Sequence, residues 1–218
     1  MQLQKTLLLR HEQTVTIAPE FLKLGNQAYA DTYEQMRSLV QGESFKDQIW
    51  LLEHPSVFTL GTAADISHVL NPGDIPVIQT DRGGEVTFHG PGQKIVYFVL
   101  DLNKREKDIR KLVGKIEKCV IEILNEYKIK SYADKKNIGI WVKNKKKIMK
   151  IAAIGIRVRK WIAYHGFAIN ISNDLSKYKN IIPCGIKDKG VTSLKEMGIN
   201  NFSKIEKIIT QKFLNTFP

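Results

Sequence analysis

Hydrophobic residues recur at helical spacing in three parts of the chain. From about Phe21 to Val40, apolar side chains share one helical face, and Gly42 ends the run. The stretch from Ile109 to Tyr127 places seven apolar side chains on one face. Near the end of the chain, Ser203 to Glu206 has capping-box spacing before another apolar stripe. These patterns predict three helices.

Shorter apolar runs separated by turn residues predict strands. The expected strands cover residues 6–10, 48–52, 58–61, 77–78, 94–102, 138–142, 148–158 and 161–171. The polar turn from Lys143 to Lys147 indicates a hairpin. Strands and helices in this order predict a single α+β domain over residues 1–218, built on a mixed sheet flanked by helices.

The stretch from residue 82 to 93 follows neither pattern. It reads RGGEVTFHGPGQ, with four glycines and a proline in twelve residues. Such a composition predicts a tightly bent backbone or a close approach by another group. Arg82, His89 and Gln93 can also bind or polarise a substrate. We expect this stretch to form one wall of a pocket, and a glycine-rich hairpin connection is the alternative.

Composition narrows the class of protein. Of 218 residues, 43% are hydrophobic and 26% are charged, which is typical of a globular chain. No apolar run approaches the roughly 20 residues that cross a bilayer, so no membrane partner is expected. The start MQLQKTLLLRHEQT lacks a long apolar signal core, which predicts a cytoplasmic location. A processed organellar protein would look the same.

The net charge of +12 has three possible meanings. It can reflect a bias of composition alone, it can steer acidic partners to the surface, or it can indicate a basic nucleic-acid-binding module. The chain lacks clustered aromatic residues within a basic stripe, which counts against nucleic-acid binding.

Lys150 lies in a predicted strand both of whose faces look buried. Alternation places it on one face with Ile148, Ala152 and Ile154. A buried ammonium without a partner is costly and tends to lose its proton. This lysine therefore requires a functional or structural explanation.

The two cysteines have different settings. Cys119 falls in the apolar stripe of the second predicted helix and is expected to be a buried small hydrophobe. Cys184 stands between Pro183 and Gly185, which leaves its sulfur uncrowded. A thiol is mostly protonated at neutral pH, and a nearby cation or base such as Lys150 favours the reactive thiolate. The spacing of His and Cys does not match a zinc site, and neither GxxxxGK[ST] nor GxGxxG is present.

Five segments together resemble a known family, the octanoyltransferases of lipoate biosynthesis. They are EHPSVFTLG at 53–61, RGGEVTFHGPGQ at 82–93, KIAAIGIRVR at 150–159, HGFAIN at 165–170 and PCG at 183–185. The resemblance spans about residues 50–195 and is weak at both ends of the chain. It implies the biotin/lipoyl ligase-like fold.

The resemblance also implies a set of site residues. Cys184 would be the nucleophile, and Lys150 would lower the pKa of its thiol and move protons. The implied substrate-binding residues are Arg82, Gly83, Gly84, Glu85, Val86, Thr87, Phe88, His89, Ala153, Ile154, Gly155, His165, Gly166, Phe167, Ala168 and Asn170. His89 and His165 either orient the substrates or are structural. Backbone N–H groups near Gly83, Gly84 or Gly185 are candidates for stabilising an oxyanion.

The implied reaction moves an octanoyl group from octanoyl-acyl carrier protein to Cys184, and then to a lysine of an apo lipoyl domain. The acceptors would be lipoyl domains of 2-oxoacid dehydrogenases or the glycine-cleavage carrier protein. No cofactor, metal or nucleic acid is expected, and we expect a monomer. The alternatives are an ATP-dependent lipoate or biotin-type protein ligase, an octanoyl amidotransferase acting between lipoyl domains, and the basic nucleic-acid-binding module.

Overall fold

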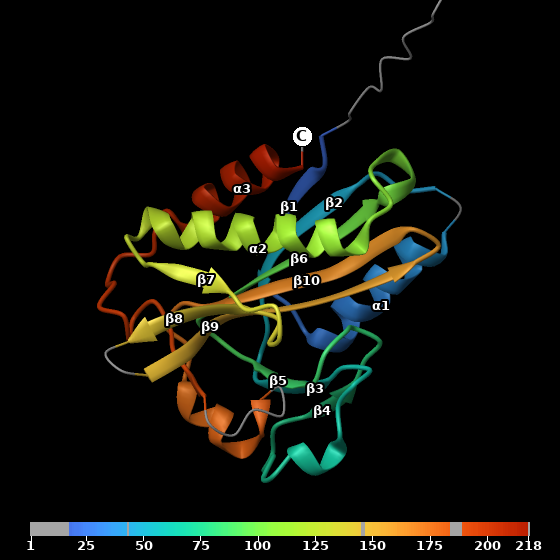
Figure 1. Cartoon of the computed structure of the whole chain (residues 1–218). Coiled ribbons are helices and arrows are strands. Elements are labelled where there is room, and N and C mark those ends of the chain that lie inside the picture. Colours follow the sequence, from blue (N-terminus) through green and yellow to red (C-terminus); the bar gives the residue numbers. More distant parts are fainter. Residues whose placement is uncertain (1–17, 43, 145–146, 184–188, 218) are drawn as a thin grey trace, which may run out of the picture.

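A large mixed sheet forms the centre of the protein (Figure 1). The computed structural model describes residues 18–42, 44–144, 147–183 and 189–217. The strands of the large sheet are β1 (Glu20–Asn26), β2 (Gln48–Glu53), β6 (Gln93–Asp101), β7 (Ser131–Ala133), β8 (Ile140–Asn144), β9 (Lys147–Arg159), β10 (Ile162–Asn170) and β11 (Gly190–Val191). Their order is β1-β2-β6-β10-β9-β8-β7, with β11 paired to β9. The pairs β1–β2 and β11–β9 are parallel, and the others are antiparallel.

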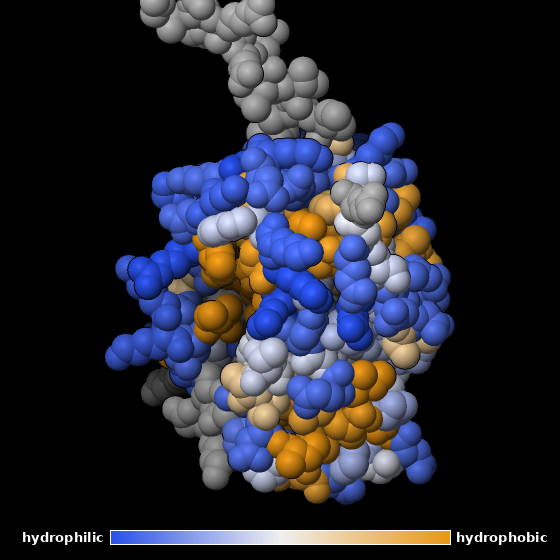
Figure 2. Space-filling view, turned by 90° about the vertical axis from the view of Figure 1, so that its right-hand side faces the viewer, coloured by the Kyte–Doolittle hydropathy of each residue, from blue (hydrophilic) through white to orange (hydrophobic). Residues whose placement is uncertain are grey.

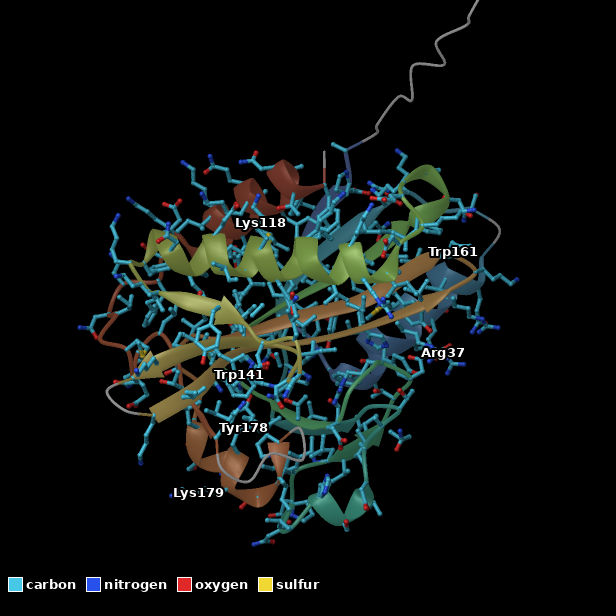
Figure 3. All side chains as sticks on the ribbon, in the orientation of Figure 1. Arg37, Lys118, Trp141, Trp161, Tyr178 and Lys179 are labelled. Carbon is cyan, nitrogen blue, oxygen red and sulfur yellow. The ribbon has the colours of Figure 1, made fainter. Side chains whose placement is uncertain are left out.

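Helices cover both faces of this sheet. The helices α2 (Ile109–Glu126) and α3 (Ile205–Thr216) pack on one face, and α1 (Tyr29–Gln41) packs on the other. Alternate residues of β6 enter the two cores, so that Phe98 faces α2 and α3 while Tyr97 faces α1. Lys118, on the outer face of α2, points away from the sheet (Figure 3). Because both faces are covered, β6 is apolar almost throughout.

A smaller sheet lies beside the large one, below it in Figure 1. Its strands, in the order β4-β3-β5, are β3 (Val57–Leu60), β4 (Val77–Gln79) and β5 (Val86–His89). Short 3-10 helices complete the fold: η1 (Ile66–His68), η2 (Leu102–Lys104) and η3 (Leu175–Asn180). Phe58 of β3 and Phe88 of β5 pack against Tyr178 of η3 in a third apolar cluster. The glycine-rich stretch 82–93 thus contains a strand, which joins it to this smaller sheet.

The predicted mixed α+β fold is confirmed, and so are most of its elements. The helix over 109–127, the hairpin of β8 and β9 and the short strand at 77–78 are present. The strand expected at 6–10 lies outside the described residues. No helix in the described part of the chain is long and apolar enough to span a bilayer. One face of the surface is largely hydrophilic, with hydrophobic areas near its middle and in its lower part (Figure 2).

The first predicted helix is wrong over its first eight residues. Residues 20–26 form β1, and the helix begins only at Tyr29. The strand pairs in parallel with β2, and its Phe21 packs edge-on against Phe213 of α3. Both contacts join residues far apart in sequence, so local spacing could not reveal them. The predicted end of the helix at Gly42 is confirmed.

The predicted capping box is also wrong. Helix α3 begins at Ile205, and no side chain bonds to its first turn from the Lys204 cap position. The Ser203 hydroxyl instead donates to the Oδ1 atom of Asn201 at 2.7 Å. The local turn thus uses the hydroxyl that the helix would need.

A bulge changes the side of β9 on which Lys150 lies. Trp141 of β8 pairs with Lys150, and the next pair is Ile140 with Ala152, so that Ile151 is the extra residue. Since Ile140 and Trp141 are consecutive, they face opposite sides of the sheet, and so do their partners. Ala152 belongs to the core under α2, and Lys150 faces the other side. The predicted shared face of Lys150 and Ala152 is therefore wrong.

Candidate active site

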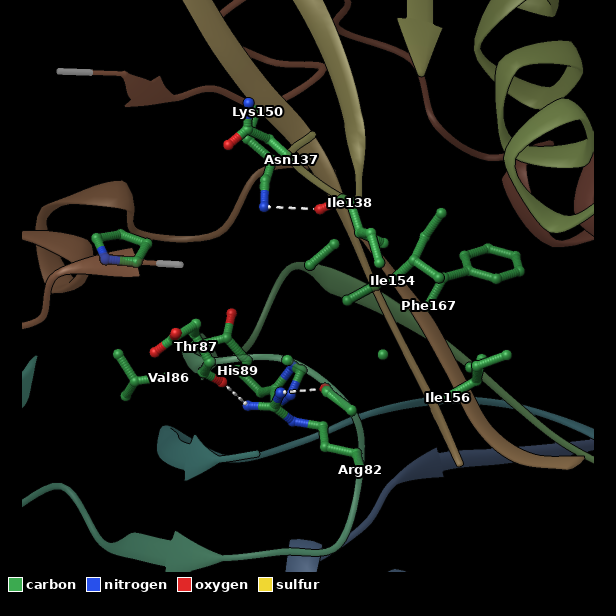
Figure 4. A pocket seen from close by; sticks show the side chains of 18 of the residues that line it. Arg82, Val86, Thr87, His89, Asn137, Ile138, Lys150, Ile154, Ile156 and Phe167 are labelled. Atoms are coloured by element: carbon green, nitrogen blue, oxygen red, sulfur yellow. Dashed lines mark hydrogen bonds between the residues drawn. The ribbon is translucent and has the colours of Figure 1, made fainter. Parts of the chain in front are cut away.

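A cavity of about 380 Å³ lies where β9, β10 and the stretch 82–89 meet (Figure 4). The predicted site residues that line it are Arg82, Gly83, Gly84, Glu85, Val86, Thr87, His89, Lys150, Ala153, Ile154, Gly155, Gly166, Phe167, Ala168 and Asn170. Two glycines let segments of backbone meet closely there. A Cβ atom on Gly155 would lie 3.0 Å from the Gly83 carbonyl oxygen, and one on Gly166 would lie 2.0 Å from that of Val96. This mostly small and apolar lining suits a hydrocarbon chain.

Lys150 is held at this cavity by contacts with the residues that lead into β8. Its side chain is buried, and its Nζ atom donates to the Ile138 carbonyl at 3.1 Å (Figure 4). The same atom lies 4.8 Å from the centre of the Trp141 ring, a distance at which a cation and an aromatic face attract each other. Gly139, at φ +135°, leaves space for it, because a Cβ atom there would lie 3.0 Å from Cε of Lys150. The lysine is thus fixed with its polar end at the cavity.

The position of Cys184 lies outside the described residues. Pro183, the residue before it in the sequence, lines the same cavity as Lys150. Gly185, a candidate oxyanion donor, also lies outside the described residues.

Arg82 lines the cavity and also stabilises its wall. Its guanidinium is buried and donates to the Thr59 carbonyl at 2.7 Å and to the Glu85 carbonyl at 2.8 Å. It also donates to the hydroxyl of Thr59 and to the Gly83 carbonyl. These bonds tie the glycine-rich segment to β3, so the structure gives Arg82 an architectural role beside any contact with substrate.

The candidate oxyanion donors are not equivalent. The Gly83 N–H donates to the Ile156 carbonyl at 3.0 Å, so that amide is already used between the stretch 82–89 and β9. Gly84 lines the cavity with φ +89°, a conformation that favours glycine. Of the two candidates in the described part of the chain, Gly84 fits the role better.

A chain of buried amides fixes the protonation of His89. The Asn170 amide donates to the Thr192 carbonyl at 3.0 Å, which turns its Oδ1 atom toward the Gln93 amide nitrogen at 2.8 Å. Gln93 therefore presents Oε1 to Nδ1 of His89, at 2.7 Å, and this ring nitrogen must carry the hydrogen. Burial is the main cause that lowers the pKa of His89 to about 3. The imidazole is neutral at physiological pH, with Nε2 as the acceptor atom.

Two of the predicted binding residues lie elsewhere. Phe88 packs into the apolar cluster of the smaller sheet, and His165 is buried against Tyr33 and Tyr164, so neither lines the cavity. Nε2 of His165 lies 2.9 Å from a carboxylate oxygen of Asp81. Burial lowers the pKa of His165, an effect that this hydrogen bond opposes.

Asp81 is the centre of that second polar cluster. Tyr164 donates a hydrogen bond to its carboxylate alongside His165. Burial by itself would raise the pKa of Asp81, but the bonds from His165, Tyr164 and Tyr33 hold it well below its ordinary value. Because Asp81 directly precedes Arg82, the cluster anchors the glycine-rich stretch against β10.

Sequence reasoning missed several lining residues. They are Tyr97, Val113, Lys136, Asn137, Ile138, Ile156, Tyr178, Pro183 and Val191. Most come from segments outside the motifs, and only the fold brings them to the cavity. Within the described ranges, no group of His, Cys, Asp and Glu side chains is arranged to hold a metal ion.

The fold and the cavity define a class of protein, and a family model agrees with them. Residues 28–216 match the model described as the lipoyl protein ligase A/B catalytic domain. The chain therefore belongs to this family. Together with the relatives described next, this match confirms the predicted resemblance and the prediction of an acyl-transferring enzyme.

Its similar proteins narrow the class further. An octanoyltransferase of Rickettsia peacockii is 51% identical over 173 residues, which cover 78% of this chain and 83% of that protein. An octanoyltransferase of Anaplasma phagocytophilum is 46% identical over 181 residues, covering 82% and 86%.

Solved structures confirm the fold at much lower identity. A lipoate protein ligase of Thermoplasma acidophilum, from a bipartite archaeal lipoylation system, superposes with a TM-score of 0.72 at 13% identity, covering 92% of this chain and 84% of that one. A lipoate-protein ligase A bound with ATP gives 0.67 at 15% identity, covering 92% and 85%. The biotin protein ligase of Aquifex aeolicus gives 0.53 at 15%, covering 92% and 69%. The predicted biotin/lipoyl ligase-like fold is confirmed.

Proposed function

We propose that this chain transfers an octanoyl group from octanoyl-acyl carrier protein to a lysine of an apo lipoyl domain, through a thioester on Cys184. The names of its relatives and its membership of a lipoylation family support this reaction. The acceptors would be lipoyl domains of 2-oxoacid dehydrogenases or the glycine-cleavage carrier protein. A monomeric state and a cytoplasmic location stay predictions.

Lys150 moves protons in both halves of the reaction. It first takes the proton of the Cys184 thiol, and the thiolate attacks the thioester carbonyl. The bond to the carrier sulfur breaks, and the departing thiolate takes the proton back from Lys150. The amine of the acceptor lysine then attacks the acyl-enzyme and displaces the Cys184 sulfur. Lys150 accepts the proton that this amine loses and returns it to the Cys184 sulfur, which leaves an amide and the free thiol.

The observation that carries the proposal is a buried lysine at an apolar cavity. Lys150 stands at a cavity that suits a hydrocarbon chain, and Pro183, next to Cys184 in the chain, lines the same cavity. A ligase that activates a free carboxylate as an adenylate has no need of Cys184.

Intact mass tests the acyl-enzyme directly. After mixing with octanoyl-acyl carrier protein, we expect one added octanoyl group, which hydroxylamine removes because a thioester is labile to it. Cys184→Ser should show no group of this lability, and Cys119→Ser should acylate like the unchanged protein. Acylation that persists without Cys184 would refute the thioester route.

An ATP-dependent ligase is the second candidate, since the fold is shared with lipoate and biotin ligases. That enzyme would modify a lipoyl domain with free octanoate only when ATP is present. Its activity would also survive Cys184→Ala. We expect neither result.

A further inference from the structure

A second cavity adjoins the first. It has a volume of about 750 Å³, and the two cavities share Tyr178, Pro183 and Val191 as walls. Tyr178 and its neighbour Lys179 come from η3, on the side of the large sheet away from α2 (Figure 3). The shared wall includes Pro183, so both cavities meet where the chain leads into Cys184.

The linings of the two cavities differ in chemistry. The second cavity mixes aliphatic side chains with groups that form hydrogen bonds. Its aliphatic side chains are Leu70, Met149, Leu175, Ile181 and Ile182, and its polar ones are Asn144, Ser176, Lys179, Lys189, Thr192 and Glu196. The first has a wall rich in glycine and alanine beside larger apolar residues, and several of its polar side chains, such as Arg82, His89 and Asn170, are already hydrogen-bonded within the protein. A plain alkyl chain fits the first lining, and a chain that carries amides fits the second.

The polar side chains of the second cavity differ in whether they already form ion pairs or hydrogen bonds within the protein. The Lys189 ammonium lies 3.3 Å from the Asp134 carboxylate and 4.7 Å from the Trp141 ring centre. Lys179 is exposed at the rim. The Thr192 hydroxyl is buried and has no hydrogen-bond partner in the described part of the chain. Because Thr192 is fully buried, its hydroxyl is not accessible from the cavity, and the exposed side chains of Ser176 and Lys179 are the ones that a ligand can reach directly.

We propose that the second cavity binds the pantetheine arm of the acyl donor, a chain of two amides that ends in a phosphodiester, with Lys179 at the phosphate. The proposal rests on the proposed function, because it takes a carrier-protein thioester as the donor. The reacting carbonyl then lies at the shared wall, with its alkyl chain in the first cavity and its arm in the second. An ammonium at an exposed rim is well placed to bind the phosphate.

Donors of increasing length test this arrangement. Octanoyl thioesters of N-acetylcysteamine, pantetheine and 4′-phosphopantetheine add first the second amide and then the phosphate. Single-turnover acylation, followed by intact mass, gives the rate and half-saturating concentration for each donor. The unchanged protein should use the three with rising efficiency.

Two variants separate the parts of the arm. Lys179→Glu should lower acylation efficiency about tenfold for the phosphopantetheine donor and leave the pantetheine donor unchanged. Ser176→Trp narrows the cavity and should slow both longer donors while the N-acetylcysteamine donor reacts normally. Lys118→Glu, on the outer face of α2 (Figure 3), makes the same charge change far from the cavity and should affect no donor.

Each other outcome overturns the proposal in a distinct way. Equal slowing of all three donors would mean that the variants disturb the shared site, and no slowing would mean that the arm lies elsewhere. Slowing only the transfer to the lipoyl domain would assign the cavity to the acceptor. If the unchanged protein formed no acyl-enzyme with any donor, the proposed function itself would fail.

Discussion

The two faces of the large sheet use their buried space in opposite ways. The face under α2 and α3 is an apolar core that includes Phe98 and even the thiol of Cys119. The face toward α1 buries polar groups among its apolar ones. There Tyr97 lies 3.0 Å from Nε2 of His54, and His89 stacks near Tyr29. Apolar groups need only be buried together, whereas each polar group needs a specific partner. The cavity takes apolar walls from both sides, with Phe167 from the core under α2, but its His89 belongs to the polar groups near α1.

Removing the Lys150 amino group should have the largest effect on catalysis. We expect Lys150→Met to lower kcat of octanoyl transfer about a thousandfold, the usual scale for a lost proton-transfer group, while the donor KM changes little. Steady-state kinetics with Lys118→Met as the control would measure this. A large rise in KM with kcat preserved would assign Lys150 to binding and remove it from the chemistry.

In the core under α2 and α3, a substitution that removes no hydrogen bond should still lower the free energy of unfolding strongly. Phe98 is fully buried and packs against Phe213, so Phe98→Ala should lower the free energy of unfolding by about 4 kcal/mol. Ile109→Ala, at a residue that is 45% exposed on α2, should cost less than about 0.5 kcal/mol. Urea denaturation compares the two variants. Similar midpoints would show that the α2 side is not the tightly packed one.

Acid should destabilise the protein by protonating buried histidines on the side of the large sheet toward α1. Burial lowers the pKa of His54 to about 4 and that of His89 to about 3, both below the unfolded value of about 6.5. Below about pH 6.5 the unfolded chain therefore binds more protons than the folded one. The free energy of unfolding then decreases as the pH is lowered. We expect a loss of roughly 4 kcal/mol between pH 7 and pH 5, nearly half from each histidine.

Urea midpoints measured across this pH range would test the assignment. Phe98→Ala should keep the pH slope of the unchanged protein, because its lesion is on the other face, and His54→Gln should reduce the slope. A slope that His54→Gln leaves intact would locate the titration elsewhere.

Changes at Cys119 should have the smallest effect on octanoyl transfer. Burial is the main cause that raises the pKa of its thiol to about 11, so it holds almost no thiolate at pH 8. Iodoacetamide should leave it unmodified in the folded protein, and Cys119→Ala should cost about 1 kcal/mol with octanoyl transfer unchanged. Rapid alkylation of this thiol would contradict the view that the core under α2 and α3 excludes water and reagents.

Much of the fold follows from local pattern, because a buried face repeats with the period of its element. Helix α2 has such a period, and β6 is a continuous apolar run because both of its faces are buried. The expected bounds of both elements lie within one residue of the observed ones. Strand β1 has no such period, since only its parallel pairing with β2 keeps it extended. Likewise, the extra residue Ile151 in β9 reverses the alternation on which the predicted face of Lys150 depended.

The sequence by itself determined the family, the mixed α+β class and the residues of the cavity wall that lie within contiguous motifs. Only the tertiary structure decided how those residues act. In the fold, the Arg82 guanidinium donates hydrogen bonds to backbone carbonyls, and His165 bonds to Asp81 outside the cavity. Tyr178 and Val191 lie in the wall that the two cavities share. Hydrogen bonds and cavity walls join residues many positions apart, and no local period along the chain encodes such pairs.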